Sequence, residues 1–318
     1  MHIQEPRRPG TRRSLFWPIA LITFGALLLL SNMGLIPSTG WAILWRFWPV
    51  ALIALGIDVL IGRRSVAGAI ASGVLLLALV GMAIGMAVFA EQIPFLVELA
   101  RPAALKTEHI NYPLEGIERA SVSIDWTSAP GYLSALDDSP NLLEADVAYR
   151  GEMAFEVQRS GSEADVTLDT YLQGIPYGNL NFDDSDTRWD VRLSPDVTLD
   201  LRLDASTGSA SFDLSGLRLS HLRIDGSSGA IDLTLPGTGS FHGDIDGGSG
   251  ALLLRATPDV GLRIVLNAGS GRFDPGDRLV LISGEPDDDG TWETPGFDRA
   301  DDRITLNIDQ GSGAIRVR

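Results

Sequence analysis

The stretch "IDGSSGAIDL" at residues 224–233 decides the fold, because it is one copy of a repeated unit. Related turns recur as "DASTGSASFDL" at 204–214, "DGGSGALLLRA" at 246–256, "NAGSGRFD" at 267–274 and "DQGSGAIRV" at 309–317. The last glycine of each turn is Gly208, Gly229, Gly250, Gly271 or Gly313, and the spacings are 21, 21, 21 and 42 residues. A fixed period of this kind is typical of proteins whose units stack on one another.

Each copy predicts a strand, a tight turn and a second strand. Apolar and polar residues alternate on both sides of the turn, which is the pattern of a half-buried strand. Apolar residues stand five positions before and two after the turn glycine: Leu203, Ile224, Ile245, Leu266 and Ile308 before it, and Ala210, Ile231, Leu252, Phe273 and Ile315 after it. One unit cannot bury its apolar face alone, so we expect an all-β, solenoid-like domain of stacked strands. Like residues at like positions favour a parallel, in-register stack over an antiparallel meander.

The glycine-rich turns also resemble phosphate-binding loops. A phosphate loop needs backbone amides at a helix N-terminus, and a P-loop needs a lysine as well. Here a strand pattern follows every turn, and the only lysine of the chain is Lys106. We therefore predict that the five turn glycines are structural and supply positive φ angles, and we expect no cofactor site.

An acidic or amide side chain stands four residues before each turn glycine. These residues are Asp204, Asp225, Asp246, Asn267 and Asp309. Carboxylates stacked on neighbouring strands repel one another, so some compensation is required. We predict a turn-capping ladder in which each side chain accepts hydrogen bonds from its own turn. The alternative is a cation held along the acidic edge, since hard ions such as calcium take oxygen ligands.

Both flanks of the repeat carry weaker versions of it. Residues 118–168 alternate in the same way, and Ile124 and Asp125 match its apolar and acidic pair. Residues 284–302 fill the one period that lacks a turn glycine, and they predict either a solvated excursion or a degenerate unit. Residues 91–118 contain three prolines and predict a juxtamembrane connector, so that the β domain spans residues 119–318.

The first hundred residues hold three long apolar runs, at 15–36, 41–61 and 66–90. Each is long enough for a helix that crosses about 30 Å of hydrocarbon, so we predict three transmembrane helices. Arginines cluster in the tail at 1–14 and in the loop at 62–65, while Arg46 is an exception. By the positive-inside rule, the N-terminus is cytoplasmic and residues 91–318 are extracytoplasmic.

The first two apolar runs share a motif, "LFWPIALITFG" at 15–25 and "RFWPVALIALG" at 46–56. We expect Trp17, Pro18, Trp48 and Pro49 at the membrane interface, where tryptophans gather and a proline fits the first helical turn. A twin-arginine export signal at 11–17 is the alternative, but the run is long and its motif is repeated. Gly81 and Gly85 form a G-x-x-x-G pattern, a candidate face for helix packing and self-association.

Charge and composition exclude several classes of protein. The formal net charge is −16, and residues 101–318 carry 18 basic and 37 acidic side chains, which disfavours nucleic-acid binding. The chain has no cysteine, its four histidines show no metal-binding spacing, and no G-x-S-x-G pattern occurs. We predict that the protein is not an enzyme and binds no metal.

The paired F-W-P-[IV]-A-L-I-x-x-G helices resemble the transmembrane region of LiaI/LiaF proteins. The stretch at 121–149, "SVSIDWTSAPGYLSALDDSPNLLEADVAY", followed by the glycine-turn repeats, is similar to the toastrack β domain of LiaF-like and adhesin-like proteins. The resemblance implies a non-enzymatic bacterial membrane protein. Some relatives modulate a sensor histidine kinase that responds to cell-wall-active antibiotics. The third apolar run departs from relatives with an even number of crossings, which would keep the β domain inside.

Two functions follow as expectations. The first is an accessory or regulator in cell-envelope stress sensing, whose partners are the lipid bilayer and another membrane protein such as a sensor kinase. The second is a membrane-anchored surface scaffold or adhesin-like binding module.

Overall fold

The computed structural model describes residues 16–36, 66–89, 92–94, 104–126, 129–171, 186–205, 208–286 and 289–318, and single positions between 40 and 56. The chain divides into two compact units, and the main boundary between them falls between residues 102 and 103.

The N-terminal unit contains helices α1 (Phe16–Asn32) and α4 (Val66–Val88). They correspond to the first and third apolar runs, while the predicted helix at 41–61 lies almost wholly outside the described residues. Leu27 of α1 and Ala87 of α4 are buried in one small apolar cluster with Ile36. Within the described residues, no helix combines the length and the hydropathy required of a membrane span.

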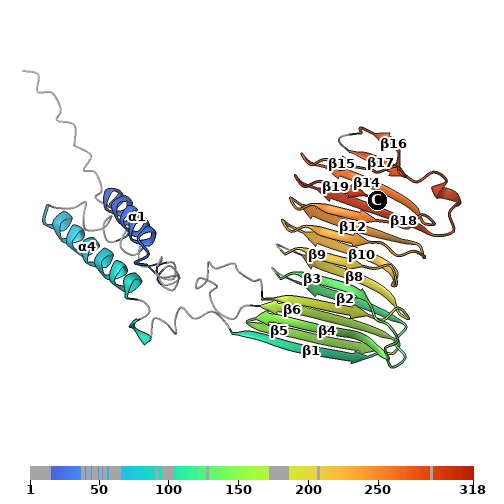
Figure 1. Ribbon diagram of the computed structural model, residues 1–318, viewed down its shortest axis with the longest axis horizontal. Coiled ribbons are helices and arrows are strands. Elements are labelled where there is room, and N and C mark those ends of the chain that lie inside the picture. Colours follow the sequence, from blue (N-terminus) through green and yellow to red (C-terminus); the bar gives the residue numbers. More distant parts are fainter. Residues whose placement is uncertain are drawn as a thin grey trace, which may run out of the picture. The chain divides into compact units, whose positions relative to one another are not determined.

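The β domain consists of two large mixed sheets, which we name sheet A and sheet B (Figure 1). In spatial order, sheet A contains β1 (Leu105–Pro113), β4 (Asn141–Arg150), β7 (Arg188–Leu193), β3 (Gly131–Ala135), β9 (Ala210–Asp213), β11 (Ile231–Thr234), β13 (Leu252–Arg255), β19 (Ile315–Val317) and β15 (Phe273–Asp274). Sheet B contains β16 (Val280–Gly284), β17 (Gly290–Glu293), β14 (Gly261–Ala268), β18 (Arg303–Gln310), β12 (Phe241–Gly248), β10 (Arg218–Gly226), β8 (Thr198–Ala205), β2 (Arg119–Asp125), β6 (Glu163–Tyr171) and β5 (Glu152–Ser160). A short 3-10 helix, η3 (Phe297–Arg299), precedes β18.

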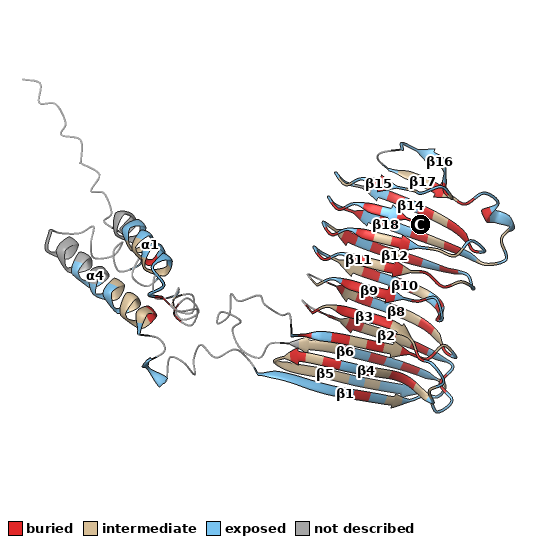
Figure 2. Cartoon of the chain, in the orientation of Figure 1, coloured by how far each residue is buried: buried red, intermediate tan, exposed pale blue. Residues whose placement is uncertain are grey.

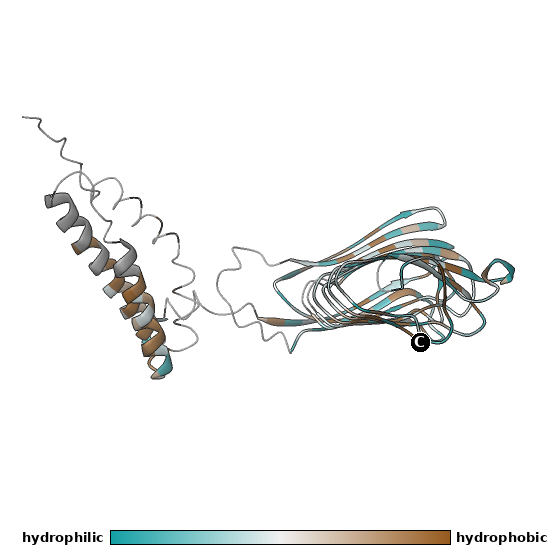
Figure 3. Ribbon diagram, turned by 90° about the horizontal axis from the view of Figure 1, so that it is seen from above, coloured by the Kyte–Doolittle hydropathy of each residue, from teal (hydrophilic) through white to brown (hydrophobic). Residues whose placement is uncertain are grey.

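Each repeat forms one rung: a strand of sheet B, a tight turn and a short strand of sheet A. Neighbouring rungs are parallel and in register, so that Ile224 pairs with Ile245 and Asp225 with Asp246. Seen along the stack, the rungs superpose (Figure 3). The parallel, in-register arrangement expected from the repeat is confirmed for these strands. The first rung is β2–β3, where Ile124 pairs with Leu203 as its sequence match predicts.

The spatial order of the rungs differs from their order in the sequence. The last rung, β18–β19, lies between β12–β13 and β14–β15. Within the 42-residue spacing from Gly271 to Gly313, the chain therefore completes the terminal rung with β15, forms β16 and β17, and returns as β18. Residues 284–302 contribute β17 and η3, and β17 pairs antiparallel with both β14 and β16. This stretch thus belongs to the terminal hairpin of sheet B.

The core lies between the two sheets, because every second residue of most strands is buried (Figure 2). The apolar row Leu203, Ile224, Ile245, Ile308 and Leu266 is buried throughout. Burial of each such side chain contributes about 1.5–3 kcal/mol to the stability of the fold, and this favours rungs that stay in register. A shift by one residue would turn this row to solvent.

The predicted boundary of the β domain at residue 119 is wrong. Strand β1 lies inside the segment assigned to the connector and pairs antiparallel with β4. Its Ile110 is buried in the core, and Tyr112 makes an edge contact with Phe155 of β5, with ring centroids 6.4 Å apart. The prolines of the segment argued against a strand there. Pro113, however, stands at the end of β1, where a missing N–H is tolerated.

Candidate binding groove

The turn glycines allow successive rungs to touch backbone to backbone. A Cβ atom added at Gly250 would overlap the carbonyl oxygen of Gly229, one at Gly313 would overlap that of Gly250, and one at Gly271 would overlap that of Gly313. None of these three glycines has a positive φ. We predicted glycine at these positions because of a left-handed turn conformation, and this reason is wrong for these three residues. Close stacking of turns on strands about 4.8 Å apart is the reason. Gly208 lies at the equivalent turn between β8 and β9.

The acidic ladder runs in register along sheet B. Its spatial order is Asp125, Asp204, Asp225, Asp246, Asp309 and Asn267. Three kinds of contact compensate the charge. An amide of the following turn donates to Oδ1 of Asp246 at 3.2 Å, which is the predicted cap. Arg223 donates from Nε to Asp225 at 2.9 Å, and the Asn267 amide donates to Asp309 at 3.4 Å.

Capping is thus one of several ways in which this ladder is neutralised. The hydrogen bond from Arg223 to Asp225, and then the charge of that carboxylate, raise the pKa of Arg223. In the described part of the chain, no group of three or more histidine, aspartate or glutamate side chains has the geometry of a metal site.

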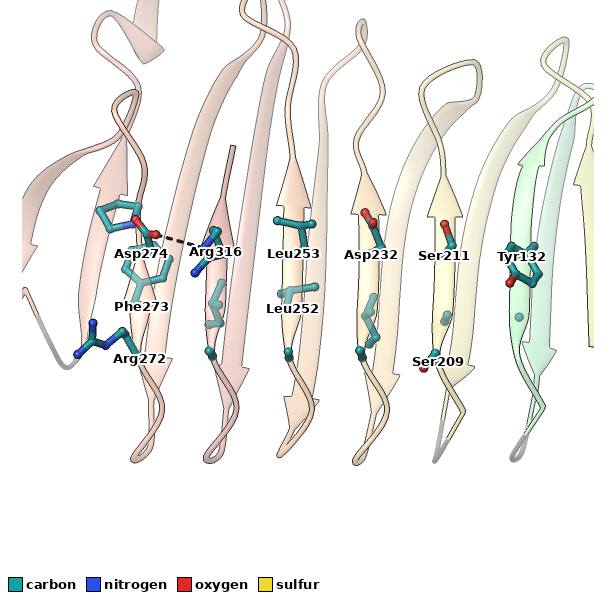
Figure 4. Close-up of a pocket in the computed structure, with 18 residues that line it drawn as sticks. Tyr132, Ser209, Ser211, Asp232, Leu252, Leu253, Arg272, Phe273, Asp274 and Arg316 are labelled. Carbon is teal, nitrogen blue, oxygen red and sulfur yellow. Dashed lines mark hydrogen bonds and ion pairs between the residues drawn. The ribbon is translucent and has the colours of Figure 1, made fainter. Parts of the chain in front are cut away.

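A groove of about 850 Å³ follows the outward face of sheet A across β3, β9, β11, β13, β19 and β15 (Figure 4). Its floor includes the residue directly after each turn glycine, which is small in four rungs: Ser209, Ala230, Ala251 and Ala314. These four residues are exposed and in register, since the amide of each following residue donates to the next rung. Because these four side chains are small, the larger side chains beside the row extend further from the sheet.

Polar and aromatic side chains stand beside this floor. Figure 4 shows Tyr132, Ser211, Asp232, Leu253, Arg316 and Asp274 in one row across the strands. Nε of Arg316 lies 3.3 Å from a carboxylate oxygen of Asp274, and Arg255 forms an ion pair with Asp232. The guanidinium of Arg188 lies over the ring of Tyr132, 4.1 Å from its centroid.

The groove offers hydroxyl, carboxylate, guanidinium and aromatic groups at a spacing of one strand. Six strands about 4.8 Å apart give a length of about 24 Å from the first to the last, which suits an extended polymer lying across them. The strand and turn pattern of the sequence does not by itself predict this surface. Its signal was the small residue after the glycine in four of five copies, with Arg272 as the exception.

The membrane-interface and helix-packing predictions fall on α1, α4 and the segment between them. Trp17 and Pro18 lie in α1, and Pro49 has helical backbone, whereas Trp48 lies outside the described residues. A Cβ atom built at Gly81 or Gly85 of α4 meets no described atom within 4 Å. Their role in packing or self-association stays a prediction.

Comparison with known proteins identifies both parts of the chain. Residues 15–60 match the LiaI-LiaF-like transmembrane region, and residues 101–255 match the N-terminal domain of toast_rack. No curated protein sequence matches the chain.

Two solved structures resemble the β domain. A protein assigned provisionally to cell adhesion, from Clostridium sporogenes, is 17% identical with a TM-score of 0.57, over 67% of this chain and 99% of that chain. A provisional adhesin from Bacteroides fragilis is 10% identical with a TM-score of 0.25, over 68% of this chain and 97% of that chain. The first likeness supports the fold, and neither matched family is a family of enzymes. In this chain a segment that matches the LiaI-LiaF-like transmembrane region is thus joined to a domain that matches the N-terminal domain of toast_rack.

Proposed function

We propose that this chain is an accessory or regulator of cell-envelope stress sensing that binds an extended envelope ligand outside the cytoplasm. The groove on sheet A carries the proposal, because it lies on a rigid in-register sheet in a chain that also has a LiaI-LiaF-like transmembrane region. In this arrangement three helices, at 15–36, 41–61 and 66–90, cross the membrane with the N-terminus inside. The solenoid-like stack of rungs then stands at residues 105–318 on the outer side.

The chemistry of the groove favours binding over catalysis. Arg316 and Asp274 neutralise each other, as do Arg255 and Asp232, so these groups are available as hydrogen-bond donors and acceptors at fixed positions. Tyr132 adds an aromatic face at the β3 end. A polymer with repeated polar groups could contact several rungs at once, and each further rung adds a similar set of contacts.

The topology can be tested with single cysteines, because the chain has none of its own. We expect Ser209→Cys, at an exposed position in the groove, to react with a membrane-impermeant maleimide on intact cells. Gly10→Cys in the basic tail is the matched control and should react only after lysis. If Ser209→Cys also required lysis, the β domain would be cytoplasmic and the proposal would be wrong.

The signalling role requires a protein partner in the membrane. Ile22 of α1 is 73% exposed within this unit, whereas Leu27 of the same helix is 9% exposed and packs in the cluster with Ala87. We expect a photo-crosslinker at Ile22 to give a stoichiometric adduct with another membrane protein of the sensor-kinase class. The same group at Leu27 should give links within the chain.

Other products from Ile22 would decide against this role. Adducts with lipid alone would leave the helices as an anchor and favour the surface scaffold or adhesin-like module. An adduct with a second copy would point to self-association of the helices, for which the Gly81 and Gly85 face is the candidate.

A further inference from the structure

The two ends of the β stack are protected to different degrees. A terminal strand presents unpaired N–H and C=O groups, and proteins usually guard such edges with charged residues, prolines or very short strands. At the β1 and β5 end, the terminal strands carry Lys106, Glu108, Glu152 and Glu156. At the other end, sheet A stops with β15, which has only two residues. Strand β16, the last strand of sheet B, has five residues without a charge or a proline, and its pairing with β17 shifts register between Leu281 and Ser283.

Strand β16 is uncharged, apolar and exposed. Its sequence is Val-Leu-Ile-Ser-Gly, and it pairs on one side only, with β17. Val280 is 52% exposed and Ile282 is 58% exposed, the highest values among the large apolar side chains described in the β domain. The strand is nevertheless well anchored, since Leu281 packs against the core and Trp292 of β17 contacts Phe273 at a centroid distance of 5.3 Å.

The surroundings of β16 are acidic at both ends. Asp277 precedes the strand, Glu285 follows it directly, and Asp289 closes the same hairpin loop; all three are exposed. Arg278, which follows Asp277, donates to the backbone carbonyls of Ala256 and Pro258 at 2.9 and 3.0 Å. Its charge is therefore directed toward the protein. Two copies of this edge placed side by side would bring like charges together, which disfavours pairing between identical chains.

We propose that β16 is a docking edge for an extended peptide segment of a partner protein, apolar in its centre and basic at both ends. The segment adds a strand to sheet B through main-chain hydrogen bonds, and its apolar side chains cover Val280 and Ile282. Its lysine or arginine residues lie near Asp277 and Glu285. This surface is distinct from the groove on sheet A, so its test is independent of the ligand proposed there.

The experiment uses the full chain in nanodiscs and a fluorescent peptide of alternating valine and threonine with a pair of lysines at each end. Ile282→Lys places a positive charge on the edge, and Val265→Lys is the matched control. Val265 is 40% exposed on β14, two strands from the edge. Its replacement by lysine adds the same charge as Ile282→Lys. We expect Ile282→Lys to raise the dissociation constant at least about tenfold and Val265→Lys to raise it less than about threefold. Hydrogen exchange at residues 280–284 should slow when the peptide binds to the unaltered chain.

Further variants separate the possible outcomes. Ile282→Thr keeps a β-branched residue and removes apolar area, so it tests the same contact if Ile282→Lys does not fold. A peptide with glutamates in place of the lysines should bind more weakly, and added salt should weaken the lysine peptide. Equal effects of the substitutions at 282 and 265, or equal affinity for both peptides, would overturn the proposal. Concentration-dependent dimers that Ile282→Lys abolishes would overturn it in favour of a second copy as the occupant.

Discussion

Replacing Gly250 with alanine is expected to lower the free energy of unfolding by about 3 kcal/mol, because the new methyl group has no space between two rungs. It would overlap the carbonyl oxygen of Gly229 and approach the backbone of Ser228. Backbone atoms cannot rotate away as a side chain can, so the rungs must separate locally. For a domain of this size we expect a fall in melting temperature of about 6–12 °C, measured by calorimetry on the full chain.

Gly237→Ala is the matched control for this substitution. The nearest atom to a Cβ at Gly237 is a methyl carbon of Thr257 at 3.7 Å, an ordinary contact. Alanine there also restricts the unfolded chain, so stability should stay unchanged or rise by up to about 1 kcal/mol. If Gly250→Ala melted together with Gly237→Ala, close stacking of the turns would not be the reason for glycine at that position.

Replacing Trp126 with alanine is expected to cost about 4 kcal/mol, within the range for large aromatic side chains removed from a core. Trp126 is 1% exposed and lies 5.2 Å from Phe212 and 6.2 Å from Trp189, between ring centroids. A Cβ atom at Gly131 would overlap its indole ring, so the neighbouring strand is already shaped to admit it. The measurement is the denaturant concentration at the unfolding midpoint of the full chain. The midpoint should fall while the slope of the unfolding free energy against denaturant concentration stays the same.

Trp126→Phe separates the volume of this side chain from its polarity. The indole Nε1 is buried and has no hydrogen-bond partner in the described residues. Loss of that N–H should therefore cost nothing, and the phenyl ring should retain much of the packing with Phe212. We expect an intermediate loss of about 1–2 kcal/mol. A Phe variant as unstable as the Ala variant would mean that the first rung tolerates only the indole.

The sequence predicts the content of each rung well. Alternation around the turn identifies Ile224 and Ile245 as core residues, and the constant offset from the glycine predicts that they pair. The reason for the glycine was harder to infer, because a sequence does not distinguish a positive φ from a close approach of another chain segment. The distinction depends on what lies on the neighbouring rung, such as the carbonyl of Gly229.

The position of the last rung is also invisible in the pattern. The copies around Gly271 and Gly313 have similar flanks, and both could follow the copy around Gly250. Side-chain complementarity favours one order. Gln310 is buried and donates from Nε2 to the Gly250 carbonyl at 2.7 Å, and the room for its side chain is left by Gly247. At the equivalent position β14 has Ala268, which has no amide group to make this bond.

The insertion of the C-terminal rung between two earlier ones affects the order of assembly. During synthesis, β14 and β15 are made before the strands that join them to β12 and β13. Until β18 and β19 are made, β12–β13 and β14–β15 each lack the neighbour with which they pair in the complete stack. The stack is therefore closed by the insertion of β18–β19, which is made later than the two rungs that it joins.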